Sequence, residues 1–150
     1  RTICIHFIID EQDIITNLKY PDMMVGSDGI PDLKGQPHPR LFGTFPRILA
    51  KYVRDDRILS LPEAVRRMTS LPAQVFGMTG RGQVKEGYWA DLVMFDPDTV
   101  QDEATYDQPK TQPTGISLVI VNGNVVMQQS IQTGIRSGKM LRYKRSAFGE

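Results

Sequence analysis

The stretch Leu118-Val-Ile-Val-Asn-Gly-Asn-Val-Val-Met127 decides the fold of the second half of the chain, because two apolar, β-branched runs flank Asn122-Gly123. Both central residues of a tight hairpin turn need positive φ, which Asn and Gly adopt at the least cost. The stretch therefore predicts an antiparallel β-hairpin. Upstream, the apolar run of residues 92–95 predicts another strand, and turn residues recur every few positions after Gly80. We therefore expect residues 81–150 to be mostly β, with a boundary near residue 80.

Helical patterns precede this boundary. Residues 45–53 place apolar side chains at i, i+3, i+4, i+7 and i+8, which predicts an amphipathic helix starting within Thr44-Phe45-Pro46. Ser60-Leu-Pro-Glu63 has the spacing of a capping box with Pro in the first turn, which predicts a second helix. Ser70-Leu-Pro-Ala73 repeats that start ahead of Gly77, so a third, short helix is expected.

The first thirty residues follow a different order. Residues 3–9 form a β-branched and aromatic run suited to a buried strand, and residues 10–18 carry acids followed by the apolar stripe of a short helix. Pro21 ends that helix, and the apolar residues 23–25 stop at Gly26-Ser-Asp-Gly29. The order strand, helix, strand predicts one βαβ step of a parallel sheet. The expected fold class is α/β followed by β.

The composition limits the classes of partner and the cellular compartment that we expect. Eighteen basic residues against seventeen acidic ones give a net charge of +1, too small to favour nucleic acid as a partner. A single cysteine cannot form an internal disulfide, and no apolar run approaches the roughly 20 residues of a membrane span. We therefore expect no membrane association and a cytoplasmic location. The chain begins on Arg1 rather than Met and enters an apolar run at once, so we expect the tail of a longer polypeptide.

Three polar residues are candidates for chemistry. Asp28 follows the second predicted strand, where (β/α) enzymes place a general base or a metal ligand. Ser27, Asp28 and Gly29 are also common turn formers, and from these three alone an ordinary turn is the favoured interpretation. His38 and Arg40 lie on the long loop that follows, where they could bind a proton or metal and a carboxylate. A surface arginine explains that motif equally well.

The sequence contains no complete metal-binding motif. Cys4 and His6 alternate onto one face of the first predicted strand, but two side chains do not make a zinc site, and core packing is the favoured interpretation. The chain has two His and one Cys, with no His-x-His, His-Glu-x-x-His or Cys-x-x-Cys. Any metal would need ligands from elsewhere.

Longer motifs carry a resemblance to a known family. Gly82-Gln-Val-Lys-Glu-Gly-Tyr-Trp-Ala-Asp-Leu-Val-Met-Phe-Asp96, followed by Val119-Ile-Val-Asn-Gly-Asn-Val-Val126, is similar to the small β domain of the amidohydrolase superfamily. Gly26-Ser-Asp-Gly29, followed by Pro37-His-Pro-Arg-Leu-Phe-Gly-Thr-Phe-Pro-Arg47, resembles the D-aminoacylase branch, the N-acyl-D-amino-acid deacylases. The resemblance covers nearly all of residues 22–142.

This resemblance implies a zinc-dependent (β/α)8 barrel with a small β-sandwich, which hydrolyses the N-acyl amide of an N-acyl-D-amino acid. Asp28 matches the catalytic aspartate, which transfers a proton from water to the leaving amine and is a possible metal ligand. Arg40 matches the arginine that binds the α-carboxylate of the substrate. Ser27 and Gly29 are assigned to substrate binding with it, and His38 is expected only to organise the loop.

The resemblance also implies an incomplete barrel. Residues 1–80 would form its last βα units, and residues 81–150 part of the β-sandwich, while the metal-binding Cys and His residues of the family would lie outside the chain. We therefore expect the C-terminal portion of a deacylase, inactive alone and prone to self-association through its uncovered apolar surface. The alternative is a non-catalytic, β-rich interaction or scaffold module derived from this tail.

Overall fold

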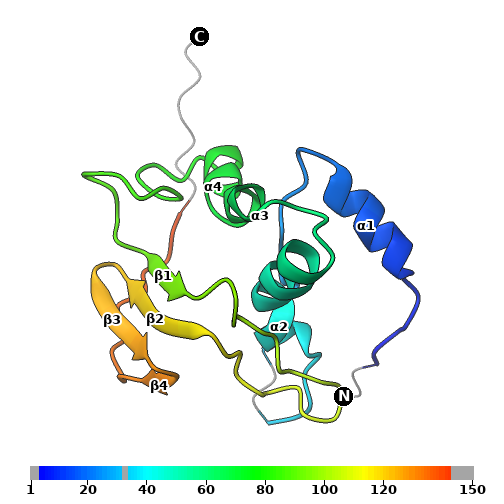
Figure 1. The fold of residues 1–150 in the computed structure, drawn as a ribbon. Helices are drawn as coiled ribbons and strands as arrows, with labels where there is room; N and C mark the ends of the chain where they lie inside the picture. The colour runs from blue at the N-terminus through cyan, green and yellow to red at the C-terminus, as the bar shows by residue number, and fades with distance from the viewer. Residues whose placement is uncertain (1–3, 32–33, 143–150) are drawn as a thin grey trace.

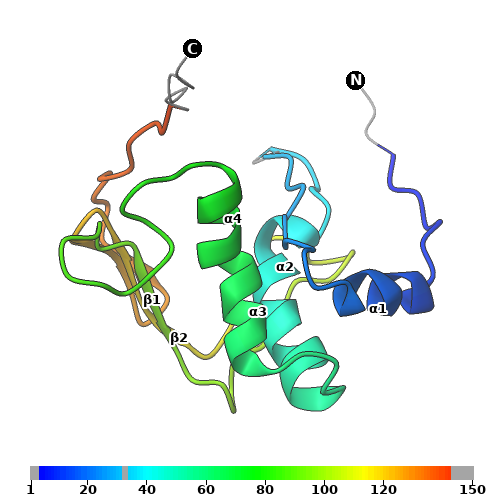
Figure 2. The same cartoon turned by 90° about the horizontal axis from the view of Figure 1, so that it is seen from above.

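A group of helices and a small antiparallel sheet lie side by side in the computed structural model, which describes residues 4–31 and 34–142 (Figure 1). Both views place α1 on the side of the helices remote from the sheet (Figures 1 and 2). Among the described residues, no helix is long and apolar enough to cross a membrane. The elements in chain order are α1 (Glu11–Lys19), α2 (Arg40–Arg47), the π-helix η1 (Ile48–Asp55), α3 (Leu61–Met68), α4 (Ser70–Val75), β1 (Leu92–Phe95), β2 (Ile116–Val121), β3 (Asn124–Gln128) and β4 (Ile131–Gln132).

The sheet is an antiparallel meander in the order β1-β2-β3-β4. The predicted hairpin and the predicted strand at 92–95 are confirmed, and Asn122 and Gly123 adopt the positive φ angles of 47° and 81° that the turn requires. The sequence did not predict β4. The turn that leads to β4 places Gln129 and Ser130 at φ angles of 47° and 63°, and these residue types give no turn signal of that kind.

The capped helices follow the sequence closely. Ser60 caps α3 by accepting a hydrogen bond from the Glu63 backbone N–H at 3.4 Å, and Asp10 caps α1 by accepting one from Gln12 at 2.7 Å. Helix α4 ends just before Gly77, which has φ of 63°. The predictions of helices near residues 10–18, 60–68 and 70–76 are therefore confirmed.

The helix predicted at 45–53 is present, but it starts earlier than predicted and changes from α-helical to π-helical at Ile48. The helix begins at Arg40, so Pro46 lies inside it rather than in its first turn. Pro46 has no N–H to donate to the helical ladder, and the wider π-helical turns of η1 begin two residues later. The long loop on which the sequence placed both His38 and Arg40 therefore ends at Pro39, and Arg40 is the first residue of α2.

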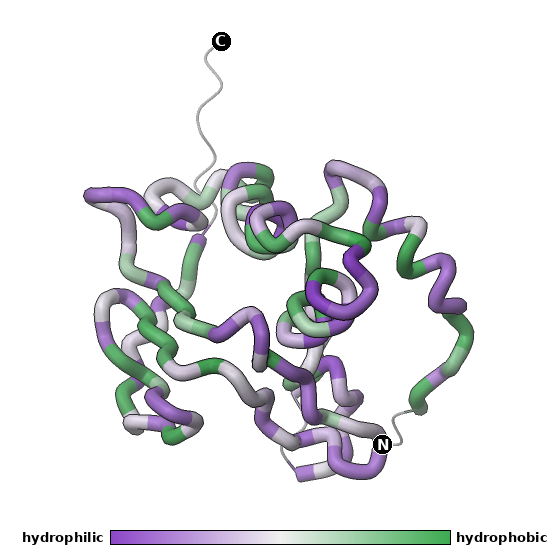
Figure 3. Tube along the Cα trace, in the orientation of Figure 1, coloured by the Kyte–Doolittle hydropathy of each residue, from purple (hydrophilic) through white to green (hydrophobic). Residues whose placement is uncertain are grey.

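The predicted βαβ step is wrong in the described residues. Residues 4–9 and 23–25 are not strands, although α1 lies between them as expected. A strand needs a neighbour for its backbone hydrogen bonds, and the Val25 N–H instead donates to the carbonyl of Arg67 in α3 at 3.2 Å. The hydrophobic segment before α1 is left on the surface (Figure 3), where Ile8 is 82% exposed.

The hydrophobic core lies among the helices. Val100, which follows β1, is fully buried in it, while Phe95 at the end of β1 and Ile116 at the start of β2 pack against it. The sheet therefore contacts the helical core at the end that holds the last residue of β1 and the first residue of β2. The buried members of the core are Leu18, Ile48, Leu49, Tyr52, Leu59, Ala64 and Val100.

Gly115 makes this junction possible. Its φ of 73° is in the left-handed region, and a Cβ at this position would overlap the backbone N and Cα of Val100. Its carbonyl accepts a hydrogen bond from the Asp96 N–H at 2.9 Å. The chain therefore needs glycine here both for its backbone conformation and for the close approach of two segments.

Arg67 links α3 to the end of α1 from inside the core. Its side chain is 4% exposed, donating from Nη1 to the carbonyl of Leu18 at 2.5 Å and from Nε to Glu63 at 2.6 Å. Arg66 donates to the same carboxylate at 2.7 Å. These hydrogen bonds, first from Arg66 and then from Arg67, lower the pKa of Glu63 to about 2.

A second polar cluster joins the loop before β1 to the β2–β3 turn. Arg81 forms an ion pair with Asp91 and donates to the side-chain oxygen of Asn122 at 2.9 Å. The ring of Trp89 lies beside two cations, with the Arg81 guanidinium 5.1 Å and the Lys139 ammonium 5.4 Å from its centre. The segment that follows the sheet is thereby held near this loop.

Candidate active site

The turn that carries Asp28 holds it in an uncommon backbone conformation. Asp28 has φ of 46°, and the Ser27 hydroxyl accepts a hydrogen bond from the Gly29 N–H at 3.2 Å across it. Positive φ is tolerated by Asp better than by most residues. The carboxylate is presented at the surface, with its side chain 81% exposed.

Gly29 brings this turn against the first residues of α2. A Cβ at Gly29 would lie 2.9 Å from the Leu41 side chain and 3.3 Å from its Cα, so the two segments approach more closely than another residue would permit. Arg40 precedes Leu41 at the start of α2. The close approach therefore sets Asp28 beside Arg40.

Asp28 and Arg40 form an ion pair. Arg40 Nη2 lies 2.8 Å from Asp28 Oδ2, and the Arg40 side chain is 37% exposed. Arg40 Nε is buried and has no hydrogen-bond partner among the residues that the structure describes. An unpaired buried donor is costly, and the guanidinium fork is suited to donate to a further anionic oxygen.

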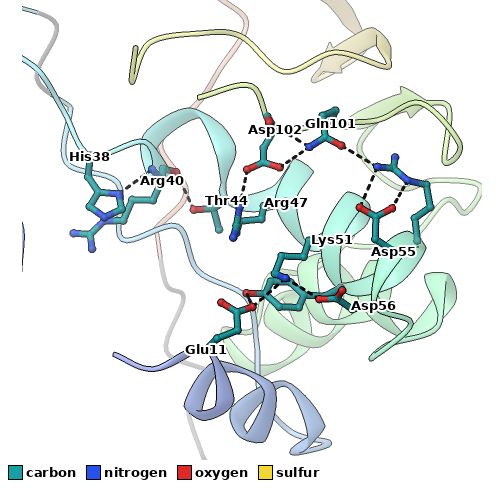
Figure 4. Close-up of polar contacts among 12 residues, drawn as sticks. Glu11, His38, Arg40, Thr44, Arg47, Lys51, Asp55, Asp56, Gln101 and Asp102 are labelled. Carbon is teal, nitrogen blue, oxygen red and sulfur yellow. Dashed lines mark hydrogen bonds and ion pairs between the residues drawn. The ribbon is translucent and has the colours of Figure 1, made fainter. Parts of the chain in front are cut away.

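His38 organises the start of α2. Its Nδ1 accepts a hydrogen bond from the Arg40 backbone N–H at 3.0 Å (Figure 4), a donor that the helix itself leaves unpaired. Burial, and then the neighbouring Arg40 charge, lower the pKa of His38, while Asp28 acts in the opposite direction. A lowered pKa favours the neutral imidazole, whose free lone pair this hydrogen bond requires.

A cavity of about 320 Å³ adjoins Arg40 and His38. Isoleucines from the segment before α1, together with Ile30, form the apolar part of its wall, to which Arg40 adds a cation. An apolar wall with one cation suits a small molecule that carries a carboxylate and an apolar part. The lining residues are Cys4, Ile5, His6, Ile8, Ile9, Ile30, Pro37, His38 and Arg40.

The described residues do not form a metal centre. No group of three or more His, Cys, Asp or Glu within 4–31 and 34–142 is arranged to hold an ion. Cys4 is a free, exposed thiol, and it shares the cavity wall with His6. The exposed Asp28 could add one oxygen ligand to a site built by other segments, so these residues alone do not fit zinc.

The structure therefore brings together the four residues that the resemblance assigned to catalysis and substrate binding, with Ser27, Asp28 and Gly29 on one turn and Arg40 beside it. Sequence reasoning missed Tyr106, in the loop between β1 and β2, whose ring meets His38 edge-on with the ring centres 5.3 Å apart. An aromatic residue in an otherwise polar loop was the only signal.

Comparison with known proteins identifies the relatives of the chain. The Amidohydro_3 profile, described as amidohydrolase family, matches residues 21–127. D-aminoacylase of Alcaligenes xylosoxydans xylosoxydans is 48% identical over 137 residues, which are 91% of this chain and 28% of the relative. N-acyl-D-glutamate deacylase of the same organism is 46% identical over 145 residues, 97% of this chain and 29% of that protein.

Solved structures agree with the sequence relatives. A crystal structure of D-aminoacylase, reported to define a novel subset of amidohydrolases, matches with a TM-score of 0.85 and 47% identity, covering 89% of this chain and 28% of that one. N-acyl-D-glutamate deacylase from Bordetella bronchiseptica, complexed with zinc and a phosphonate inhibitor, matches with a TM-score of 0.77 and 50% identity over 81% and 25% of the two chains. A binuclear metal centre is described for a further D-aminoacylase structure.

The chain thus spans less than a third of the length of the relatives it matches. The family profile covers most of the chain, and it includes both the Asp28 turn and Arg40. This chain belongs to the amidohydrolase family.

Proposed function

We propose that the chain forms the C-terminal portion of an amidohydrolase that hydrolyses N-acyl-D-amino acids to a D-amino acid and a carboxylate. The observation that carries the proposal is the 2.8 Å separation of Asp28 and Arg40. In such a substrate the carboxylate and the amide nitrogen are attached to the same carbon atom. A cation that binds the carboxylate and a group that moves a proton at the nitrogen must therefore lie within a few ångströms of each other.

Arg40 binds the α-carboxylate in this proposal. Its ion pair with Asp28 lies largely in solvent, and exposed pairs contribute only about 0–1 kcal/mol, so an incoming carboxylate can replace Asp28 at little cost. Once Asp28 has moved away, Nη2 and a second N–H of the guanidinium can make the two-point contact that orients a carboxylate. The Ser27 hydroxyl closes the turn by accepting from the Gly29 N–H, and Gly29 lets the turn approach Leu41 of α2, so we assign both residues to substrate binding through the placement of Asp28 beside Arg40.

Asp28 transfers the proton. Once its carboxylate is released from Arg40, it can accept a proton from the attacking water and return it to the leaving amine. Zinc in the complete enzyme would polarise the amide carbonyl, with ligands supplied by segments outside this chain, since the described residues do not form its site. The 150 residues are therefore expected to be inactive alone.

The division of the chain supports the same proposal. Among the described residues, the helices end before Gly80 and the strands begin after it. Residues 1–80 are proposed to complete a catalytic barrel and residues 81–150 to form part of a β-sandwich. The uncovered Phe7, Ile8 and Ile9 favour self-association of the isolated chain, and a monomer in sedimentation would contradict that part.

A chimaera with a relative tests the function, because the relative supplies the segments that lie outside this chain. The matching 28% of the Alcaligenes D-aminoacylase is replaced by this chain, and zinc content and hydrolysis of N-acetyl-D-methionine are measured. We expect an active chimaera, with kcat lowered about 10²- to 10⁴-fold by Asp28→Asn. Arg40→Met should raise KM about 10- to 100-fold, and N-acetyl-L-methionine is the control substrate.

Two outcomes would contradict the proposal. One is an Asp28→Asn chimaera with undiminished kcat. The other is a folded, zinc-loaded chimaera that hydrolyses neither N-acetyl-D-methionine nor N-acetyl-D-glutamate, which would favour the non-catalytic interaction module instead.

A further inference from the structure

Side-chain hydrogen bonds attach the loop between β1 and β2 to α2 and η1. Asp102 Oδ2 accepts a hydrogen bond from Arg47 Nη1 at 3.3 Å, and Gln101 Oε1 accepts one from Arg54 Nη2 at 2.8 Å (Figure 4). Gly43 lies against the same segment, since a Cβ there would meet the Asp102 side chain at 3.4 Å, an ordinary van der Waals contact. This part of the loop is therefore bound to the helix that begins with Arg40.

The same loop carries an aromatic ring to the start of that helix. Tyr106 lies in a turn closed by hydrogen bonds from Gln108 N–H to the Thr105 hydroxyl at 3.0 Å and from Thr105 N–H to the Gln108 carbonyl at 3.3 Å. Its ring meets His38 edge-on, with the ring centres 5.3 Å apart and the planes at 76°. Phe7 contacts the ring as well, at 4.8 Å. Such contacts between aromatic rings are favourable beyond simple burial.

One hydrogen bond links Arg40 to the His38 ring that Tyr106 contacts. Pro39, at the N-cap of α2, has no side chain that caps the helix, so the His38 imidazole supplies the acceptor for the Arg40 N–H. The hydrogen bond requires one orientation of the imidazole ring, and Tyr106 packs against that ring. A shift of Tyr106 would therefore free His38 to rotate and loosen the first residue of α2.

We propose that Tyr106 is a positioning residue, which holds Arg40 in place for the substrate carboxylate by fixing the ring of His38. The proposal rests on the proposed function of Arg40. It gives the β1–β2 loop, which lies far from Asp28 in sequence, a part in substrate binding. Tyr106 itself contacts neither Arg40 nor the substrate in this account.

The first experiment follows the order of Arg40 in the 150-residue chain by NMR. The ¹⁵N relaxation of Arg40 Nε–H and the tautomer of His38 are recorded for Tyr106→Ala, Tyr106→Phe and the control Tyr88→Ala, whose ring lies beside Lys85 instead. We expect Tyr106→Ala to lower the order of Arg40 and to mix the tautomers of His38. Tyr106→Phe, which keeps the ring, should match the parent chain. Unchanged order of Arg40 in Tyr106→Ala would overturn the inference.

The second experiment uses the chimaera and compares two substrates. For N-acetyl-D-methionine, Tyr106→Ala should raise KM about 3- to 10-fold, the loss of one aromatic contact, and leave kcat within about twofold. For N-acetyl-D-methioninamide, which lacks the carboxylate, the substitution should have no effect on KM. An equal effect on both substrates would overturn the inference. A folded, zinc-loaded chimaera that hydrolyses neither N-acetyl-D-methionine nor N-acetyl-D-glutamate would contradict the proposed function, while the NMR result still decides whether Tyr106 positions Arg40.

Discussion

Gly115→Ala should destabilise the chain far more than the same substitution at Gly123. The two glycines have similar φ angles, 73° and 81°, so the cost of forcing alanine into the left-handed region, about 1–2 kcal/mol, is shared. Only Gly115 meets another segment, because its Cβ would overlap the backbone of the fully buried Val100, whereas nothing lies within 4 Å of a Cβ at Gly123.

Overpacking of a core adds about 1–3 kcal/mol, and a backbone neighbour cannot relieve the overlap by changing rotamer. We therefore expect a loss in unfolding free energy of about 2–5 kcal/mol for Gly115→Ala and about 1–2 kcal/mol for Gly123→Ala. Urea unfolding followed by circular dichroism gives both values. If Gly115→Ala costs no more than Gly123→Ala, the contact between this glycine and Val100 does not join the sheet to the helices, and the reasoning fails.

Two further predictions concern Glu63 and the two arginines that bind it. Arg67→Met should cost about 2 kcal/mol of unfolding free energy, because it leaves the Leu18 carbonyl and the carboxylate without their buried donor. Arg66→Met, at a 39% exposed side chain, should cost much less, and equal losses in urea would contradict this. Because the pKa of Glu63 is lowered from 4.5 to about 2, its stabilisation is complete above about pH 4.5 and is lost as the pH falls toward 2. Thermal unfolding across that range should show a weaker pH dependence for Glu63→Gln, and an unchanged profile would show that the carboxylate is not held as described.

The sequence predicted the elements whose signals are local. Asn122-Gly123 specifies its turn through the φ angles of two adjacent residues, and Ser60 and Glu63 specify a helix start three residues apart. Neither signal depends on distant parts of the chain. The hairpin and α3 were therefore predicted correctly from a few residues each.

The errors arose where the outcome depends on distant partners. Residues 4–9 have strong β propensity, but a strand also needs a neighbouring strand, and among the described residues none pairs with them. Pro46 signalled a helix start, but packing of the buried Ile48 and Leu49 carries the helix through it.

The candidate site shows the same contrast. The proximity of Asp28 to Arg40 followed from the family motif, whereas the close approach at Gly29 that creates it is visible only in the fold. The ring of Tyr106 reaches His38 across 68 positions of sequence (106 − 38), and nothing in the local pattern marks such a contact.

The single tryptophan gives this molecule a spectroscopic label at one known place. Because the indole is flanked by a guanidinium and an ammonium, its emission reports the detachment of those cations rather than the melting of the helical core. Far-ultraviolet ellipticity comes mainly from the helices. Coincident fluorescence and ellipticity curves would mean that both sides unfold as one cooperative unit, and separated curves would show that the β-rich side can come apart first.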